Sequence, residues 1–198
     1  MPSFKTLQPN TGSIHVIDGD PLDKAGAAVA PATGEIVTKH VQFGPFCQTT
    51  LTLNNVPQTV VNGTEYQGTK IYDFPQGRLL VMGVTATLQQ KTTSAILTTL
   101  NSGTGAISLG TATASSTTLN STMADLLPST AFTSSTVINV AGTAVSAALA
   151  ASAQFDGTTT AKDVFLNTAY ATTGDVDDDA TQTISGTVVI TWTQLGDF

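Results

Sequence analysis

Two clusters of aspartate residues, one of them with the spacing of calcium ligands, are the groups in this sequence that most directly suggest metal binding. Asp175, Asp177 and Asp179 stand at positions one, three and five of a loop of the kind that binds calcium through carboxylate oxygens. That loop also requires a glycine at position six and a glutamate at position twelve, where this sequence has Ala180 and Gly186. We therefore expect a solvated acidic loop, with calcium binding at residues 175–179 as the alternative. A second acidic cluster, with the same two interpretations, comprises Asp18, Asp20 and Asp23.

Other groups suited to catalysis are few. Nucleophilic catalysis needs a base beside a serine or cysteine, and His15 and His40 are the only imidazoles. No G-x-S-x-G motif accompanies them, and the single cysteine, Cys47, is interpreted as a small packed side chain. The segment GTEYQGTK, residues 63–70, spaces two glycines as a phosphate loop does, but threonine precedes its lysine, which favours a β-turn. The sequence therefore predicts a protein that is not an enzyme, with no cofactor and no resident metal.

The composition argues against two classes of partner. Only 11% of the residues are charged, the formal net charge is -7 and the pI is near 4.4. Nucleic-acid affinity comes largely from lysine and arginine neutralising phosphates, so we expect no nucleic-acid partner. No apolar run approaches the roughly 18 residues of a membrane-spanning helix, and no segment of signal-peptide type is found at the start, so we expect no membrane partner and synthesis in the cytosol.

Threonine dominates the polar residues, and it favours strands. It supplies 37 of the 198 residues, and its branched side chain suits a pleated, half-wet surface. In ISGTVVITWTQLGDF, residues 184–198, side chains alternate between two faces. One face carries Val188, Ile190, Trp192 and Gln194, and the other carries Thr187, Val189, Thr191 and Thr193. The last segment is therefore predicted to be a strand with one packed face and one threonine-rich face.

Three further apolar runs are predicted as strands between turns: Thr49–Leu53, Val60-Val61 and Arg78–Leu88. The first is Thr49–Leu53, followed by a turn at Asn54, Asn55 and Pro57. The longest internal one is Arg78–Leu88, with Gly83 marking a bulge or a close neighbour. Its packed face is predicted to hold Leu80, Met82, Val84, Ala86 and Leu88. A short helical turn is predicted at residues 121–128, with Thr122 as N-cap and Asp125 in the position of a capping box.

The alanine-rich stretch GTAVSAALAASAQF is ambiguous between helix and strand. Alanine favours a helix, but the apolar residues from Val145 to Phe155 repeat at period two, and Asp156-Gly157 is a hairpin-turn signal. We interpret the stretch as a strand and Lys162–Tyr170 as the strand that returns from it. The last strand is then predicted to pair back across the acidic loop.

These elements predict an all-β fold, an antiparallel β-sandwich of the jelly-roll kind, over residues 41–198. Residues 1–40 mix glycine, proline, alanine and aspartate with only brief apolar pairs. They are predicted to form an extended N-terminal arm that becomes ordered against a partner.

Three segments resemble a known class of proteins. They are residues 72–88, 107–130 and 162–198, with the most specific features in Asp73-Phe74-Pro75, Gly77-Arg78 and Gly196-Asp197-Phe198. Together they cover about half of the chain, and they resemble the small decoration, or cement, proteins that cover the outside of tailed-bacteriophage capsids. The resemblance implies a virion structural protein, assembled in the host cytoplasm, that binds the outer capsid surface and stabilises contacts between capsomers. It implies the major capsid protein and further copies of the chain, as a homodimer or homotrimer, as partners.

We expect two sets of contact residues from this resemblance. Capsid contacts are expected in the arm, at Phe4, Ile14, Val16 and Ile17. Self-association is expected at Thr191 and Trp192, with a core position as the alternative for the tryptophan. Two other functions stay open: a receptor- or carbohydrate-binding fibre module, and a hydrolase with a carboxylate pair in a groove. The first needs grouped exposed aromatics, for which the candidates are Tyr66, Tyr72, Tyr170 and Trp192.

Overall fold

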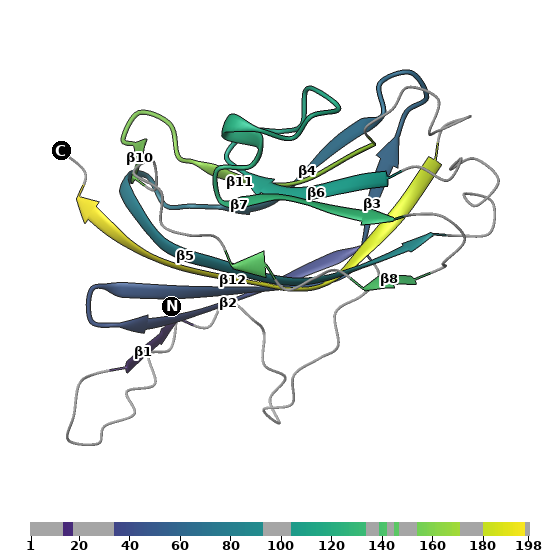
Figure 1. The fold of residues 1–198 in the computed structure, drawn as a ribbon. Coiled ribbons are helices and arrows are strands. Elements are labelled where there is room, and N and C mark those ends of the chain that lie inside the picture. Colours follow the sequence, from purple (N-terminus) through teal and green to yellow (C-terminus); the bar gives the residue numbers. More distant parts are fainter. Residues whose placement is uncertain are drawn as a thin grey trace, which may run out of the picture.

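Two antiparallel sheets packed face to face form the fold, which confirms the expected β-sandwich (Figure 1). The computed structural model describes residues 14–17, 34–92, 104–133, 139–141, 145–146, 154–170 and 180–196. Within these residues, no helix is long and apolar enough to cross a membrane.

The large sheet has β12 (Ala180–Gly196) near its centre, between β3 (Phe46–Val60) and β5 (Gly77–Thr92). Its remaining strands are β1 (Ile14–Ile17) and β2 (Glu35–Phe43) beyond β3, and β8 (Asn139–Ala141), β9 (Val145–Ser146) and β10 (Gln154–Gly157), which all pair with β5. The small sheet runs in the order β4 (Tyr66–Asp73), β11 (Asp163–Tyr170), β6 (Thr104–Gly110) and β7 (Leu127–Thr133).

The last strand alternates as the sequence indicates. Val188, Ile190 and Trp192 are buried against the small sheet, whereas Thr187 and Thr191 on the other face are only half-buried. The pattern weakens at the end of the strand, where Thr193 is buried and donates its hydroxyl hydrogen to the Pro45 carbonyl. β12 is therefore held on both edges and on one face, while most of its threonine face lies outside the core.

A bulge in β5 corrects the predicted packed face of that strand. The register with β12 slips between Thr191, opposite Gly83, and Trp192, opposite Val81. Because one extra residue reverses the alternation, the buried residues before the bulge are Leu79 and Val81. Leu80 and Met82, predicted to face the core, are only partly buried, whereas the prediction for Val84, Ala86 and Leu88 is confirmed.

The predicted turn at residues 54–57 is wrong, because β3 continues through it. Asn55 adopts a φ of 49° and its N–H donates to the Ser185 hydroxyl, while the register with β12 slips between Ile184 and Gly186. These residues form a bulge, not a turn. Pro57 is tolerated in the strand because β2 pairs with β3 only as far as Asn54, so no partner on that side needs the missing N–H.

The connections also differ from the expected hairpins. β10 pairs with β5 in the large sheet, whereas the next strand, β11, lies in the small sheet, so residues 158–162 cross between layers and form no hairpin turn. β12 pairs with β3 and β5 and does not pair back with β11. The helical turn is a 3-10 helix, Ser121–Met123, whose N-cap is Asn120, and Asp125 accepts hydrogen bonds from Thr111 in place of closing a capping box.

The expected boundary between arm and domain falls inside a strand. β2 begins at Glu35, and Ile36 packs against the core, so residues 35–40 belong to the large sheet. β1 pairs with the second half of β2, from His40 to Phe43. The large sheet therefore extends into the first 40 residues.

The interior is aromatic at one end and polar at the other. Around Trp192 the space between the sheets is filled by rings, whereas Gln58, Gln90 and Gln182 of the large sheet meet Thr168 and Tyr170 of the small sheet at the opposite end. The Tyr170 hydroxyl donates to Gln182 Oε1 at 2.6 Å and accepts from Gln90 Nε2 at 3.1 Å. Such side-chain bonds let polar residues be buried where the two sheets meet.

Candidate interface on the large sheet

The outer face of the large sheet presents rows of hydroxyl groups. Thr52 of β3 stands opposite Thr187 of β12, which in turn stands opposite Thr87 of β5. One step along, Thr50, Val189 and Thr85 form the next row. All six side chains are exposed or half-buried, and none is charged. Cross-strand rows of branched side chains stiffen a sheet, and an uncharged row can be covered by another protein without desolvating an ion.

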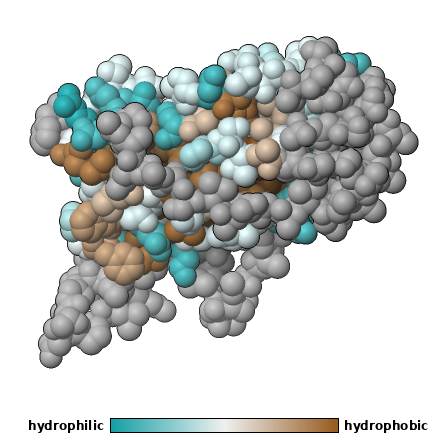
Figure 2. Space-filling view, viewed as in Figure 1, coloured by the Kyte–Doolittle hydropathy of each residue, from teal (hydrophilic) through white to brown (hydrophobic). Residues whose placement is uncertain are grey.

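Two phenylalanines extend this face at the tip of the β2–β3 hairpin. Phe43 and Phe46 stand opposite each other across a turn at Gly44 and Pro45, and their side chains are 49% and 43% exposed. Figure 2 shows hydrophobic surface gathered at the end of the molecule where this hairpin lies. Exposed large apolar groups in one place are typical of an interaction surface.

The turn that carries these phenylalanines is fixed by hydrogen bonds. Gly44 adopts a φ of 59°, which favours glycine, and its carbonyl accepts from Gln42 Nε2 at 3.1 Å. The Pro45 carbonyl accepts from the Thr193 hydroxyl of β12 at 2.6 Å. The hairpin tip is thereby tied to the last strand, so it is already ordered before any partner binds.

A ladder of rings lies beneath the hairpin. His40, Tyr72, Phe74 and Trp192 follow one another with ring centroids 5.7, 5.1 and 5.5 Å apart, the last two contacts edge to face. Thr49 anchors both ends of the ladder. Its Oγ1 lies 3.0 Å from His40 Nδ1 and accepts from Trp192 Nε1 at 2.8 Å.

The electrostatics of this region favour neutral side chains. Burial raises the pKa of Tyr72 to about 12, raises the pKa of the Cys47 thiol and lowers the pKa of His40. A reactive cysteine needs a lowered pKa, so Cys47 is poorly suited to nucleophilic chemistry. The cluster serves to pack and orient the hairpin.

One carboxylate pair that the sequence did not suggest lies on the small sheet. Lys70 Nζ is 2.5 Å from Asp73 Oδ1 and 3.3 Å from Asp163 Oδ1. The Lys70 ammonium holds the pKa of Asp73 below its usual range, and the hydrogen bond with Asp73 raises the pKa of Asp163. Lys70 contacts both carboxyls, and both are solvent-accessible, which makes this an exposed ion cluster more than a catalytic pair.

The predicted contact residues are only partly brought together. Thr191 lies on the outer face, opposite Gln48 and Gly83, whereas Trp192 occupies the core position that was its alternative. The three predicted residues of β1 lie at the edge of the large sheet, where Ile14, Val16 and Ile17 stand opposite Phe43, Val41 and His40. Phe4 and both acidic clusters, including residues 175–179, lie outside the described residues.

Sequence reasoning missed Phe43 and Phe46, although a signal was present. FGPF places a Gly-Pro turn between two phenylalanines, and such a turn brings them opposite each other. Among the described residues, no group of three or more histidine, cysteine, aspartate or glutamate side chains is arranged to hold a metal ion. No protein-family model, curated protein or solved structure matches this chain.

Proposed function

We propose that this chain is a virion structural protein that binds the outer surface of a bacteriophage capsid and stabilises contacts between capsomers. Its partners are the major capsid protein and further copies of the chain. The proposal rests on the resemblance of residues 72–88, 107–130 and 162–198 to capsid decoration proteins. It also rests on the kind of surface that the large sheet presents.

The observation that carries the proposal is the uncharged patch made by the threonine rows of β3, β12 and β5, which shares the outer face with the Phe43–Phe46 pair, while Glu35 and Lys39 lie on the neighbouring strand β2. The chain has a net charge of -7, yet the threonine rows of β3, β12 and β5 contain no ion. A protein that acts by covering another surface needs such a face, because each buried charge without a partner opposes binding. The preordered hairpin lowers the entropy that is lost on binding.

The energy available from one copy is modest. Each phenylalanine is about half exposed and would contribute roughly 1 kcal/mol on complete burial. Copies that also touch each other on a closed shell bind by avidity, which multiplies weak contacts without any new contact type. A decoration layer therefore needs no large energy per copy.

A receptor- or carbohydrate-binding fibre module is the second candidate. Its stacking platform would need exposed rings, but Tyr170 and Trp192 are buried, and Tyr72 is part of the interior ladder. The exposed rings that remain at the hairpin are phenylalanines without a polar group to orient a sugar. The described surface therefore favours the capsid role.

Imaging of particles with and without the chain tests the proposal. We expect outer density to disappear from an intact shell when the chain is absent, and to return when purified chain is added. The bare shells should also break at a lower temperature. Chain that binds host cells and leaves bare shells undecorated would replace the capsid role with the fibre role.

A substitution at the hairpin tests the surface itself. Phe46→Ser should weaken binding to bare shells about fivefold, since about 1 kcal/mol of apolar burial is lost in each copy. Val61→Ser is the matched control, because Val61 is 44% exposed and directly follows β3, at the end far from the hairpin. Equal loss of affinity in both variants would show that the hairpin is not a specific part of the interface.

A further inference from the structure

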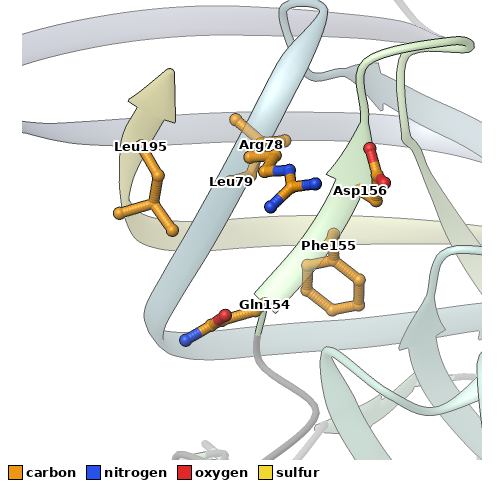
Figure 3. A pocket seen from close by; sticks show the side chains of 6 residues that line it. All are labelled: Arg78, Leu79, Gln154, Phe155, Asp156 and Leu195. Carbon is orange, nitrogen blue, oxygen red and sulfur yellow. The ribbon is translucent and has the colours of Figure 1, made fainter. Parts of the chain in front are cut away.

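The pocket at the start of β5 is electrically neutral. It has a volume of about 400 Å³, and Arg78 and Asp156 are among its lining residues. These two residues stand opposite each other in the pairing of β10 with β5 (Figure 3). Hydrogen bonds from Thr158, with a smaller contribution from the Arg78 charge, hold the pKa of Asp156 below its usual range. Groups that can react with each other lie instead at the polar end of the interior, where the two sheets meet.

A threonine hydroxyl and a glutamine side-chain amide are in contact in that interior. Thr168 of β11 and Gln182 of β12 are both buried, and Gln182 Nε2 lies 3.4 Å from Thr168 Oγ1. The two residues belong to different sheets, so their contact crosses the space between the layers (Figure 1). An alcohol that attacks a primary amide forms an ester and releases ammonia. This pair therefore has the functional groups of a covalent cross-link.

Two hydrogen-bond donors point at the carbonyl oxygen of the Gln182 amide. The Tyr170 hydroxyl donates to Gln182 Oε1 at 2.6 Å, and Gln90 Nε2 donates to the same oxygen. Donors aimed at a carbonyl oxygen stabilise the negative charge that develops there when a nucleophile attacks. Tyr170 and Gln90 are buried, so water does not screen this stabilisation. The Gln182 amide is therefore more electrophilic than an amide in water.

Gln58 orients the nucleophile. The Thr168 hydroxyl donates to Gln58 Oε1 at 3.3 Å, and Gln58 is itself held because its Nε2 donates to the Leu166 carbonyl at 3.5 Å. Because its hydrogen points to Gln58, Thr168 Oγ1 can turn a lone pair toward Gln182. The Gln182 Cδ atom is bonded to Nε2 at about 1.3 Å, so it lies within about 5 Å of Oγ1. A shift of about 1–2 Å then gives the distance from which attack occurs.

We propose that Thr168 and Gln182 form an intramolecular ester that joins β11 to β12 through the interior. Thr168 Oγ1 bonds to Gln182 Cδ, the Cδ–Nε2 bond breaks, and the hydroxyl hydrogen moves to Nε2, which leaves as ammonia. The step balances without an oxidant, a reductant or a further reactant. It occurs once in each molecule, so the proximity of the two groups is sufficient and rapid turnover is not needed. The inference concerns the chain alone and does not depend on a capsid role.

The ester strengthens the sandwich where contact between the sheets is polar. It closes residues 168–182 into a ring, which restricts the unfolded chain as a disulfide does. It also ties the last strand, which lies near the centre of the large sheet, to a central strand of the small sheet. The two layers are then joined by a covalent bond at this end and by packed rings at the other.

Intact mass spectrometry tests the proposal on the wild-type chain. The purified chain should be lighter than its sequence by one ammonia, about 17 Da, and the modified fraction should increase during incubation at neutral pH. Trypsin leaves both residues in one peptide, 163–198, because no lysine or arginine follows Lys162. That peptide should carry the loss, and fragment ions from within residues 168–182 should be missing, because two bonds must break to release them. An unchanged mass after prolonged incubation overturns the proposal. A link from this peptide to peptide 40–70, which contains Gln58, overturns the assignment to Gln182.

Substitutions separate the ester from an ordinary hydrogen-bond network. Thr168→Val should abolish the mass loss, whereas Thr168→Ser, which keeps a hydroxyl, should retain it. Tyr170→Phe removes one donor from Gln182 Oε1 and should slow formation of the ester at least about tenfold. Thr193→Val, which removes a buried hydroxyl near the other end of β12, is the control and should react as the wild type does. Urea unfolding shows that each variant is folded. Mass loss from peptide 163–198 in Thr168→Val would overturn the proposal.

Discussion

The outer faces of the two sheets lie in opposite environments. On the large sheet, the threonine rows of β12 and its neighbours remain exposed or half-buried. On the small sheet, β11 is buried on both faces, since Asn167 and Ala169 on the outer side are as inaccessible as Leu166 and Tyr170 on the inner side. The difference arises because residues 111–126 fold back over the small sheet and form a second, smaller core there.

Three residues let that loop approach so closely. Asn167 Oδ1 accepts from the Ala114 N–H at 2.8 Å, and its Nδ2 donates to the carbonyls of Ala112 and Met123 at 2.9 Å. Gly68 and Gly110 leave the space in which the loop lies, because a Cβ on either would meet loop atoms within 2.3 Å. A polar face is thus covered by the chain's own loop only where particular residues satisfy its backbone groups. The large sheet has no such loop among the described residues.

Replacing Gly110 with alanine should lift the loop from the small sheet and give the largest loss of stability. A Cβ there would come within 2.3 Å of the Met123 carbonyl carbon and the Thr122 carbonyl oxygen, both backbone atoms that cannot move without lifting the loop. We expect Gly110→Ala to lower the free energy of unfolding by roughly 3 kcal/mol. Urea unfolding measures the change.

Gly83 of the large sheet is the matched control. No atom lies within 4 Å of the position that its Cβ would take. Gly83→Ala should therefore leave the free energy of unfolding unchanged or raise it by about 0.5 kcal/mol, through the smaller entropy of the unfolded chain. If the two alanine variants lost similar stability, the contrast between a covered and an uncovered face would be wrong.

Removing the amide of Asn167 should have the next largest effect. Asn167→Ala leaves the buried Ala114 N–H and the half-buried Ala112 carbonyl without this partner, at a cost of about 2 kcal/mol. Hydrogen exchange of the Ala114 amide should accelerate as well. Asn120→Ala is the control, because Asn120 is exposed and its side chain makes no capping bond, and its stability should not change. Slow exchange at Ala114 in Asn167→Ala would mean that other contacts hold the loop.

The different environments of the two faces explain what could be predicted from the sequence. β12 was predicted from its alternation, since one face meets the core and the other does not. The coverage of β11 could not be predicted, because Asn167 is buried by a loop that lies about 50 residues away in the sequence. A polar residue in a strand looks exposed until the partner of its amide is known.

The wrong predictions within β5 and β3 arose at residues that are compatible with more than one backbone conformation. Gly83 indicated a bulge or a close neighbour, and the bulge reverses the faces of Leu80 and Met82. Asn54-Asn55 indicated a turn, but β12 pairs with β3 on both sides of these residues, so they form a bulge within a continuous strand. Pairing with distant strands decided both cases. The Phe43–Phe46 pair, in contrast, could have been predicted from its Gly-Pro turn alone.

The pH dependence of stability tests how well the interior between the two sheets excludes water at Tyr72. The pKa of Tyr72 is raised to about 12 by burial, against about 10 in an unfolded chain. Its neutral form is favoured in the folded state, so its contribution to stability is complete below pH 10 and is lost as the pH rises from about 10 to about 12. Because Tyr72 is only half-buried, we expect a loss of about 1 kcal/mol.

Comparison of the wild type with Tyr72→Phe separates the effect of Tyr72 ionisation on stability from the effects of other titrating groups. The stability difference between the two proteins should shrink by this amount between about pH 10 and pH 12, as measured by urea unfolding. Absorbance of the phenolate reports the pKa directly. A Tyr72 pKa near 10 would show that water reaches the ring ladder, and the large sheet would then be exposed on both faces near the hairpin.

Introducing one negative charge on the outer face of each sheet should have the smallest effect on stability. The two variants can therefore show whether binding is affected when folding is not. Thr87→Glu on the large sheet and Thr118→Glu on the loop over the small sheet both alter exposed side chains, so each should change the free energy of unfolding by less than about 0.5 kcal/mol. Binding to bare shells should fall only for Thr87→Glu, because a carboxylate in the threonine rows would lose its hydration without gaining a partner. Loss of binding for Thr118→Glu alone would move the interface to the small sheet, and the loop of residues 111–126 would then be the contact surface.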